Sequence, residues 1–173
     1  MSIFVWNRSK SRKNGHLAAM RKNLGDAEFV SLCSGHLKLN GVKAIAKELA
    51  GAIARGTKVV VYSNDIHTEQ EAADELAALG AEHIVVKSRK RYLHTKLYYF
   101  ESGDRYSAII GSANITEGAL TSNEEFSYAP TGIKGDFQHQ QIAAYLQHLD
   151  STCRRYEARR IDGNGQPIRL VYR

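Results

Sequence analysis

The feature of the sequence that most constrains the fold is a regular alternation of short apolar runs with helical periodicity in residues 29–86. The apolar runs, which suit strands covered on both faces, are residues 29–32, 58–62 and 83–86. Between them, segments 41–55 and 69–79 carry apolar residues at helical spacing, and a glycine follows each segment. This order of elements predicts right-handed crossovers onto a mostly parallel sheet.

The second half of the chain predicts strands of the opposite direction. Segments 97–100 and 106–110 have the character of strands, and the four residues 101–104 would join them as a hairpin. Antiparallel strands should therefore stand beside the parallel ones. Residues 126–129 are expected to add a strand, and residues 137–155 to form a helix.

The end of the chain predicts a turn and an edge strand in residues 161–173. The strand would begin at Pro167 and should lie at a sheet edge, because proline cannot donate a hydrogen bond to a ladder. We therefore predict an α/β fold with a mixed parallel and antiparallel sheet flanked by helices. Residues 1–173 would form one domain, since no linker interrupts the sequence.

The positive charge of the chain is unevenly placed. The formal net charge is +6, and the basic N-terminal segment 1–25 holds six Lys and Arg residues without an acid. Another basic cluster, made of arginines, lies in residues 154–160. A second basic run directly precedes His94 and consists of Lys87, Arg89, Lys90 and Arg91. Such clusters suggest a nucleic-acid partner, because neutralised phosphates release counterions, although solvated surface faces would explain them too.

Composition and length exclude several classes of protein. A chain of 173 residues can bury a core without a disulfide or a structural metal. Cys33 and Cys153 lack the spacing of zinc or redox sites, so we expect both to be reduced, and we predict neither a metal nor another cofactor. With no run long enough for a membrane helix and no secretory signal in the first thirty residues, we expect a cytoplasmic protein without a membrane partner.

The first of three chemically informative motifs is His94-Thr95-Lys96. On a strand, His94 and Lys96 would project from the same face, because side chains alternate with period two. Imidazole can act as nucleophile or as general acid and base, while an ammonium beside it can hold the non-bridging oxygens of a phosphate. The pair is therefore chemically sufficient for phosphoryl transfer without a metal.

The other two motifs supply supporting groups. Gly111-Ser112-Ala113-Asn114 ends a predicted strand, where small residues let the backbone approach a ligand and an asparagine amide can donate to a phosphate oxygen. Asn123-Glu124-Glu125 follows, and it adds a carboxylate. Each motif alone is common. The first could be a polar strand, the second a turn, and the third the start of another strand. Their order and combination make the signal specific.

Together these residues resemble the phospholipase D superfamily, whose pattern is His-x-Lys, an acidic residue five positions later, Gly-Ser-x-Asn and Asn-x-Glu. The residues that fall on this pattern in order are His94, Lys96, Glu101, Gly111, Ser112, Asn114, Asn123 and Glu125. Position 101 departs from the usual aspartate. Because the chain holds one His-x-Lys motif and two-domain members hold two, it is most similar to the single-motif bacterial endonucleases, which pair two chains.

The resemblance implies a phospholipase D-like fold and a metal-independent phosphodiesterase that works as a homodimer. His94 of one subunit would attack phosphorus to give a covalent phosphohistidine, and His94 of the partner subunit would protonate the leaving oxygen. Lys96 and Asn114 would hold the phosphate oxygens, and Glu125 would orient the histidine. The residues expected to support the phosphate are Ser112, Glu101 and Asn123.

We therefore expect an endonuclease that cleaves DNA or RNA, with the basic run before His94 in contact with the nucleic acid. Two alternatives stay open: a nucleic-acid-binding module of the same fold with weak catalysis, and a phospholipase-type phosphodiesterase. The intact set of His94, Lys96, Asn114 and Glu125 argues against the first alternative. The lack of an evident amphipathic insertion helix argues against the second.

Overall fold

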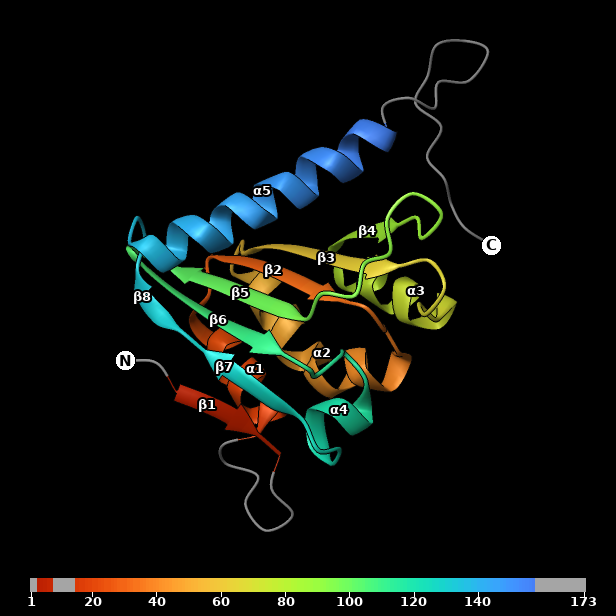
Figure 1. Ribbon diagram of the computed structural model, residues 1–173. Coiled ribbons are helices and arrows are strands. Elements are labelled where there is room, and N and C mark those ends of the chain that lie inside the picture. Colours follow the sequence, from red (N-terminus) through yellow and green to blue (C-terminus); the bar gives the residue numbers. More distant parts are fainter. Residues whose placement is uncertain (1–2, 8–14, 158–173) are drawn as a thin grey trace. The chain divides into compact units, whose positions relative to one another are not determined.

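A mixed eight-stranded sheet organises the first of two compact units in this computed structural model, which describes residues 3–7 and 15–157 (Figure 1). The strands are β1 (Ile3–Trp6), β2 (Phe29–Ser34), β3 (Lys58–Asn64), β4 (Glu82–Val86), β5 (Leu97–Ser102), β6 (Arg105–Gly111), β7 (Phe126–Ala129) and β8 (Thr131–Ile133). The helices are α1 (His16–Asp26), α2 (Leu39–Ala54), α3 (Gln70–Leu79), α4 (Glu117–Thr121) and α5 (Phe137–Glu157). The sheet runs β1-β7-β6-β5-β2-β3-β4, and β8 pairs with β6.

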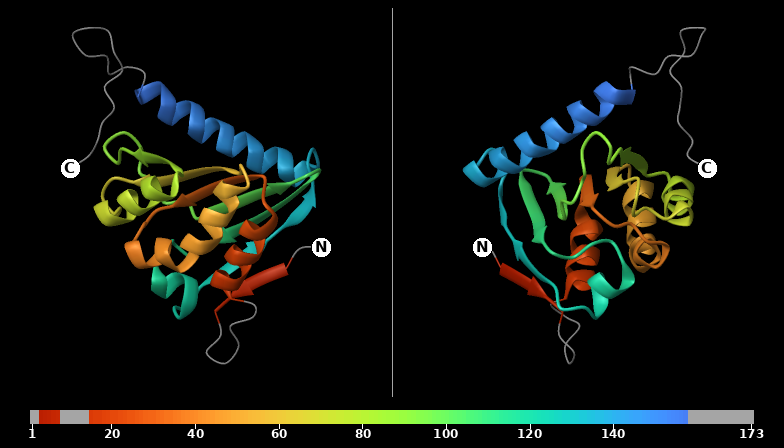
Figure 2. Two further views of the ribbon diagram at one scale, coloured as in Figure 1. Left: turned by 180° about the vertical axis from the view of Figure 1, so that it is seen from behind. Right: turned by 45° about the vertical axis from the view of Figure 1, so that its right-hand side comes forward.

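The parallel half of the sheet forms as the apolar runs predict. β2, β3 and β4 pair in parallel, and α2 and α3 are the crossovers between them. The central strands β2 and β3 are buried along almost their whole length, which explains why their apolar runs are continuous. α1, α2 and α3 lie on one face of the sheet (Figure 2), and α2 buries Val42, Ile45 and Leu49 in the core.

The direction of the strands reverses between β2 and β5. β5 pairs antiparallel with β2, and the ladder continues antiparallel through β6, β7 and β1. The mixed sheet flanked by helices confirms the predicted fold class. The predicted connection of four residues between β5 and β6 is wrong, because Glu101 and Ser102 belong to β5. The turn holds only Gly103 and Asp104, and the positive φ of Gly103, 57°, suits so tight a connection.

The described residues contain four elements that the sequence did not predict: β1, α1, α4 and β8. β1 lies in the basic N-terminal segment and pairs with β7, which is distant in sequence, so a run of four residues carried too little signal. α1 buries only His16, Met20 and Leu24, and α4 has five residues. Short elements of this kind are fixed by tertiary packing more than by their own periodicity.

The second unit, Gly135–Arg173, contains α5. This helix confirms the predicted helical segment and ends two residues later than expected. Its start is capped by Asp136, whose carboxylate accepts a hydrogen bond from the N–H of His139 at 2.8 Å. The predicted turn and edge strand at 161–173 lie outside the described residues, and a single domain over residues 1–173 stays a prediction.

Across the described part of the chain, no helix combines the length and the apolar character that crossing a bilayer requires. Both cysteines, Cys33 and Cys153, are buried, and neither forms a disulfide.

We expect the free energy of unfolding to fall as the pH falls from about 6.5 to about 4, because of His83 on β4. Burial lowers the pKa of this imidazole from 6.5 to about 4, and its Nε2 lies 2.8 Å from the hydroxyl of Ser63. The ring stays neutral in the folded protein while the unfolded chain takes up a proton. Its contribution is therefore complete above pH 6.5 and is lost toward pH 4, by at most about 1.4 kcal/mol per pH unit.

Urea unfolding of the wild type and of His83→Gln between pH 4.5 and 7.5 measures this effect. Glutamine can still hydrogen-bond to Ser63 but does not titrate, so the difference in free energy between the two proteins should change with pH. A difference that is constant over this range would contradict the assignment.

Candidate active site

His94 and Lys96 meet at the edge of the sheet where β5 begins. The prediction that they lie on a strand is wrong, because β5 starts at Leu97 and residues 91–96 form an irregular segment. Their side chains nevertheless converge. The Nζ of Lys96 lies 3.0 Å from the Nε2 of His94 and donates to the His94 carbonyl at 2.9 Å. An ammonium group has only donors, so in this contact Nε2 is the acceptor.

The ends of two parallel strands hold the backbone at His94. After β2, a Cβ at Gly35 would lie only 3.3 Å from the Cα of His94 and 3.4 Å from its Nδ1, so the missing side chain permits this approach. At the end of β3, the buried Asn64 donates to the carbonyl of Leu93 at 3.1 Å. His94 therefore stands at the carboxyl ends of parallel strands, where open α/β sheets bind their ligands.

Ser112 and Glu125 form a hydrogen-bonded pair at the same edge. The Ser112 hydroxyl donates to the Glu125 carboxylate and accepts from the N–H of Phe126 at 3.1 Å. Gly111, which ends β6, makes this pairing possible. A Cβ at Gly111 would lie 2.6 Å from the Cα of Ser127, and closer still to the Ser127 hydroxyl. β6 and β7 thus come close enough to join Ser112 and Glu125 only because residue 111 has no side chain.

Lys96 and Glu125 share one electrostatic environment. Partial burial lowers the pKa of the Lys96 ammonium, and the negative charge of Glu125 opposes that effect. The carboxylate therefore favours the charged form of Lys96, the form that can hold a phosphate oxygen. This interaction links the pair formed by His94 and Lys96 to the pair formed by Ser112 and Glu125.

A buried polar network supports the segment that carries Glu125. The ring of His16 lies between the Oδ1 of Asn7, 3.0 Å from Nδ1, and the hydroxyl of Ser127, 2.9 Å from Nε2. Burial lowers the pKa of His16, while the charge of Glu125 opposes the shift. Asn7 also donates to the carbonyls of Ala119 and Asn123 at 2.8 and 3.0 Å. The network ties the end of β1 to the loop that precedes β7.

The two asparagines of the motifs have different surroundings. The Oδ1 of Asn114 accepts a hydrogen bond from the N–H of His36 at 3.0 Å. The Nδ2 group of Asn114 would therefore make the predicted contact to phosphate. Asn123 instead closes the end of α4. Its N–H donates to the Gly118 carbonyl at 2.7 Å, and its side chain lies so close to Gly118 that a Cβ there would be 2.7 Å from the Asn123 Oδ1.

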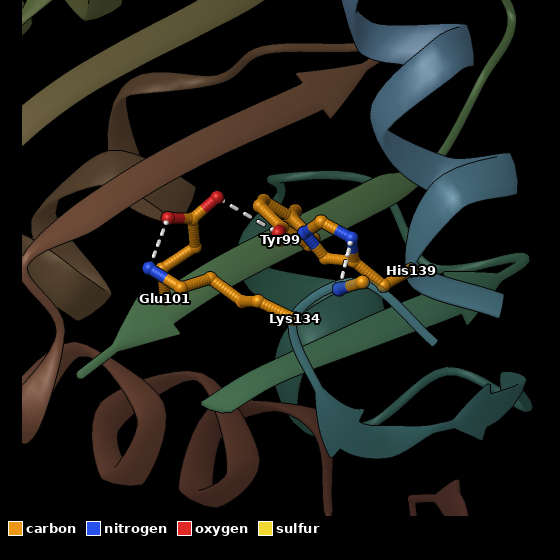
Figure 3. A network of polar contacts seen from close by, with 5 residues as sticks. Tyr99, Glu101, Lys134 and His139 are labelled. Atoms are coloured by element: carbon orange, nitrogen blue, oxygen red, sulfur yellow. Dashed lines mark hydrogen bonds and ion pairs between the residues drawn. The ribbon is translucent and has the colours of Figure 1, made fainter. Parts of the chain in front are cut away.

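Glu101 is not brought together with these residues. It lies toward the opposite end of β5 from Lys96, where its carboxylate accepts from the Tyr99 hydroxyl at 2.9 Å and pairs with Lys134 at 3.2 Å (Figure 3). These contacts differ from the expected support of the phosphate. In the second unit, the N–H of Gly135 donates to the Nδ1 of His139 at 2.9 Å.

The basic run forms a loop that leads from β4 to His94. The carboxylate of Asp65 fixes this loop by accepting from the N–H and the hydroxyl of Ser88, at 2.9 and 2.5 Å. The N–H groups of Lys90 and Arg91 donate to the Lys87 carbonyl at 2.9 and 3.0 Å, which closes a turn. Lys87 is half-buried, and the exposed cations of the loop are Arg89, Lys90 and Arg91. Three exposed cations therefore stand a few residues before the histidine.

Sequence reasoning missed three rings beside His94. These belong to His36, which follows β2, to His67, which follows β3, and to Tyr92. Successive ring centroids are 4.2 Å apart from His36 to His67, 6.3 Å from His67 to Tyr92 and 5.9 Å from Tyr92 to His94. The signal that could have found the two histidines is their position, because each follows a parallel strand by two or three residues.

An open pocket of about 450 Å³ lies against the pair formed by Ser112 and Glu125, and its lining consists of Trp6, Ser112, Glu124, Glu125 and Phe126. Its volume is within the range of small-ligand sites. The aromatic walls belong to a larger cluster on β1 and β7, in which Phe4 and Phe126 stack with centroids 5.1 Å apart and remain 54% and 58% exposed. An aromatic surface thus borders the polar site.

Comparison with known proteins identifies the family of this fold. Residues 26–148 match the family model described as "Cardiolipin synthase, PLD-like domain". No curated protein sequence matches the chain. The matched segment includes the candidate site residues His94, Lys96, Ser112, Asn114 and Glu125.

Solved structures of similar fold include two that match over nearly their whole length. Nuc of Salmonella typhimurium, a phospholipase D family member, is 15% identical with a TM-score of 0.66, over 87% of this chain and 93% of that one. NucT of Helicobacter pylori is 16% identical with a TM-score of 0.67, over 88% and 97%. A mutant of yeast tyrosyl-DNA phosphodiesterase is 13% identical with a TM-score of 0.56, over 79% of this chain and 34% of that one.

Replacing Gly111 with alanine should force β6 away from β7 and separate Ser112 from Glu125. Overpacking of this kind costs about 1–3 kcal/mol of stability, so the urea midpoint should fall. The matched control is Gly25→Ala in α1, where a Cβ would meet nothing within 4 Å and the helix should gain up to about 1 kcal/mol. Equal urea midpoints for the two variants would show that the approach of β6 to β7 does not require glycine.

Proposed function

Because this chain belongs to the family of PLD-like domains, we propose that it is a phosphodiesterase that cleaves nucleic acid with His94 as its nucleophile. The observation that carries this proposal is the contact between the Nζ of Lys96 and the Nε2 of His94 at the carboxyl ends of β2 and β3. A nitrogen lone pair, a cation for phosphate oxygens and a nearby carboxylate are the groups that transfer of a phosphoryl group needs.

In the proposed reaction the lone pair of His94 Nε2 forms a bond to phosphorus while the bond from phosphorus to the leaving oxygen breaks. Lys96 and the Nδ2 group of Asn114 hold the non-bridging oxygens, on which negative charge increases. The product of this first step is a covalent phosphohistidine. In the second step, water attacks phosphorus and releases His94.

The proposal assigns proton transfer to His94 of the partner subunit. That imidazole would give its proton to the leaving oxygen in the first step and take a proton from water in the second. One ring cannot do both, because the imidazole bonded to phosphorus lies on the side opposite the leaving oxygen. A closed twofold dimer supplies the second ring from the same sequence.

The aromatic cluster on β1 and β7 supports such a dimer. Phe4, Trp6 and Phe126 form an apolar surface beside the pocket at Ser112 and Glu125, and exposed apolar surfaces of this kind commonly mark interaction sites. A second copy that covers this surface would bring its own site close to the first. We therefore propose that the twofold interface passes over these aromatic side chains.

The proposed roles of the remaining residues follow from their contacts. Ser112 would hold the Glu125 carboxylate in place, and Glu125 would keep Lys96 charged. An orienting bond from Glu125 to His94 stays a prediction. The exposed Arg89, Lys90 and Arg91 would attract the nucleic-acid backbone toward His94. A cytoplasmic location and independence from metals also stay predictions.

Measuring cleavage of nucleic acid in excess chelator tests whether the protein is a nuclease that needs no metal. Wild type should cut labelled single-stranded DNA, RNA or plasmid, and His94→Ala should lower the rate by about a thousandfold or more, because the nucleophile is lost. His148→Ala, an exposed histidine on α5, is the matched control and should retain full activity. A wild type that binds these nucleic acids without cutting any of them would identify a binding module instead.

Mixing subunits tests whether one site needs two chains. Adding an equal amount of His94→Ala to wild type and allowing the subunits to exchange should reduce cleavage to about half, because half of the wild-type subunits then sit in mixed dimers. A tenfold excess should leave roughly a tenth of the activity. Cleavage that does not change at either ratio, with exchange verified by labelled subunits, would show that each chain works alone.

A further inference from the structure

We propose that His36 and His67 form a second phosphate subsite, which holds the phosphodiester next to the one that His94 attacks. The inference rests on the proposed function, since it assigns a substrate with consecutive phosphates to this edge of the sheet. Neither histidine has a role in the reaction described above, although both lie beside its nucleophile.

The four rings form one continuous row that ends at His94. The rings of His36 and His67 lie against each other with centroids 4.2 Å apart and planes inclined by 35°. Tyr92 presents its ring edge-on to His67 and stacks on His94 at 5.9 Å with an angle of 28°. Tyr92 is 48% exposed, and the two histidines are half-buried, so the row is accessible from solvent.

The main chain at both histidines is fixed by residues of the candidate active site. The N–H of His36 is held by Asn114, and its carbonyl accepts from the Ser34 hydroxyl at 2.6 Å. The N–H of His67 donates to the Oδ1 of Asn64 at 2.9 Å, and its carbonyl accepts from the N–H of Leu37 at 3.0 Å. The two loops are thus tied to each other and to the residues that position His94, as a built subsite requires.

The surroundings of the pair favour an anion. The pKa of His36 is lowered by burial, and electrostatic interactions with His67, Lys96, His94 and Lys38 lower it further. Lys38 is paired with Glu69, whose carboxylate lies 3.2 Å from the Lys38 Nζ and accepts from the N–H of Leu39 at 2.8 Å. A bound phosphate would be attracted by the ammonium groups of Lys96 and Lys38 and would accept hydrogen bonds from both imidazoles.

The chemistry of the pair favours phosphate over a metal ion. Two imidazoles alone do not complete the coordination of zinc. Among the described residues, no group of three or more His, Cys, Asp or Glu side chains is arranged to hold a metal. The neighbours that the row does provide, Lys96 and Lys38, would repel a cation. A nucleic-acid strand instead carries a negative charge at every nucleotide, so a phosphate beside the scissile one is always present.

Comparing a substrate that has one phosphate with a substrate that has several tests whether His36 and His67 bind a neighbouring phosphate. For wild type, His36→Gln, His67→Gln and the control His148→Gln, kcat and KM are measured on bis(p-nitrophenyl) phosphate and on a labelled oligothymidylate. Glutamine leaves the main-chain bonds of both loops intact. We expect the first two variants to raise KM for oligothymidylate about tenfold, because a bound phosphate favours a protonated imidazole and glutamine cannot take up a proton. The kcat/KM for the single diester should stay within about twofold of wild type.

Binding without cleavage separates this inference from the proposed reaction. In the His94→Ala background, fluorescence anisotropy should show that His67→Gln weakens binding of oligothymidylate about tenfold, whether or not wild type cleaves it. Affinity that is unchanged would overturn the subsite. So would an equal loss of activity on both substrates, which would assign the pair to positioning His94, and so would zinc binding that depends on His36 and His67.

Discussion

The site depends on the reversal of strand direction between β2 and β5. Because Leu97 pairs with Cys33 in an antiparallel ladder, the segment before β5 starts at the edge where β2 and β3 end. β6 returns to this edge, since Ile110 pairs with Leu97, and β7 departs from it, since Ser127 pairs with Gly111. All three motifs therefore border one edge of the sheet because each precedes or follows a strand that begins or ends there.

Close backbone contact makes this arrangement tight. Gly111 permits β6 to approach β7, and Gly35 permits the loop after β2 to approach His94. Gly41 has the same function behind the site, because a Cβ there would lie 2.6 Å from the backbone nitrogen of Thr116. Ser34 adds a hydrogen bond from the Ile115 N–H at 2.8 Å. The segment after Asn114 is thus held between α2 and the end of β2, where a side chain at residue 41 would not fit.

The sequence predicted the parallel half of the sheet because β2 and β3, buried on both faces, have continuous apolar runs. It also predicted the hairpin of β5 and β6, since glycine marks the turn. The sequence did not predict β1, because the burial of this strand depends on β7, a partner distant in sequence. The motifs identified His94, Lys96, Ser112 and Glu125 as neighbours, but spacing alone did not show that Glu101 points to Tyr99 and Lys134. His36 and His67 carry no motif, and only the topology of the sheet brings them to His94.

The contact between Lys96 and His94 has a consequence for the protein at rest. The lone pair that would attack phosphorus is already occupied, because it accepts a hydrogen bond from the lysine. An incoming phosphate offers the ammonium a better, negatively charged acceptor and so draws it away from the ring. Binding of the anion would therefore release the lone pair of His94 for attack. An electrophile without negative charge would leave the hydrogen bond from Lys96 to His94 in place, and the lone pair would stay occupied.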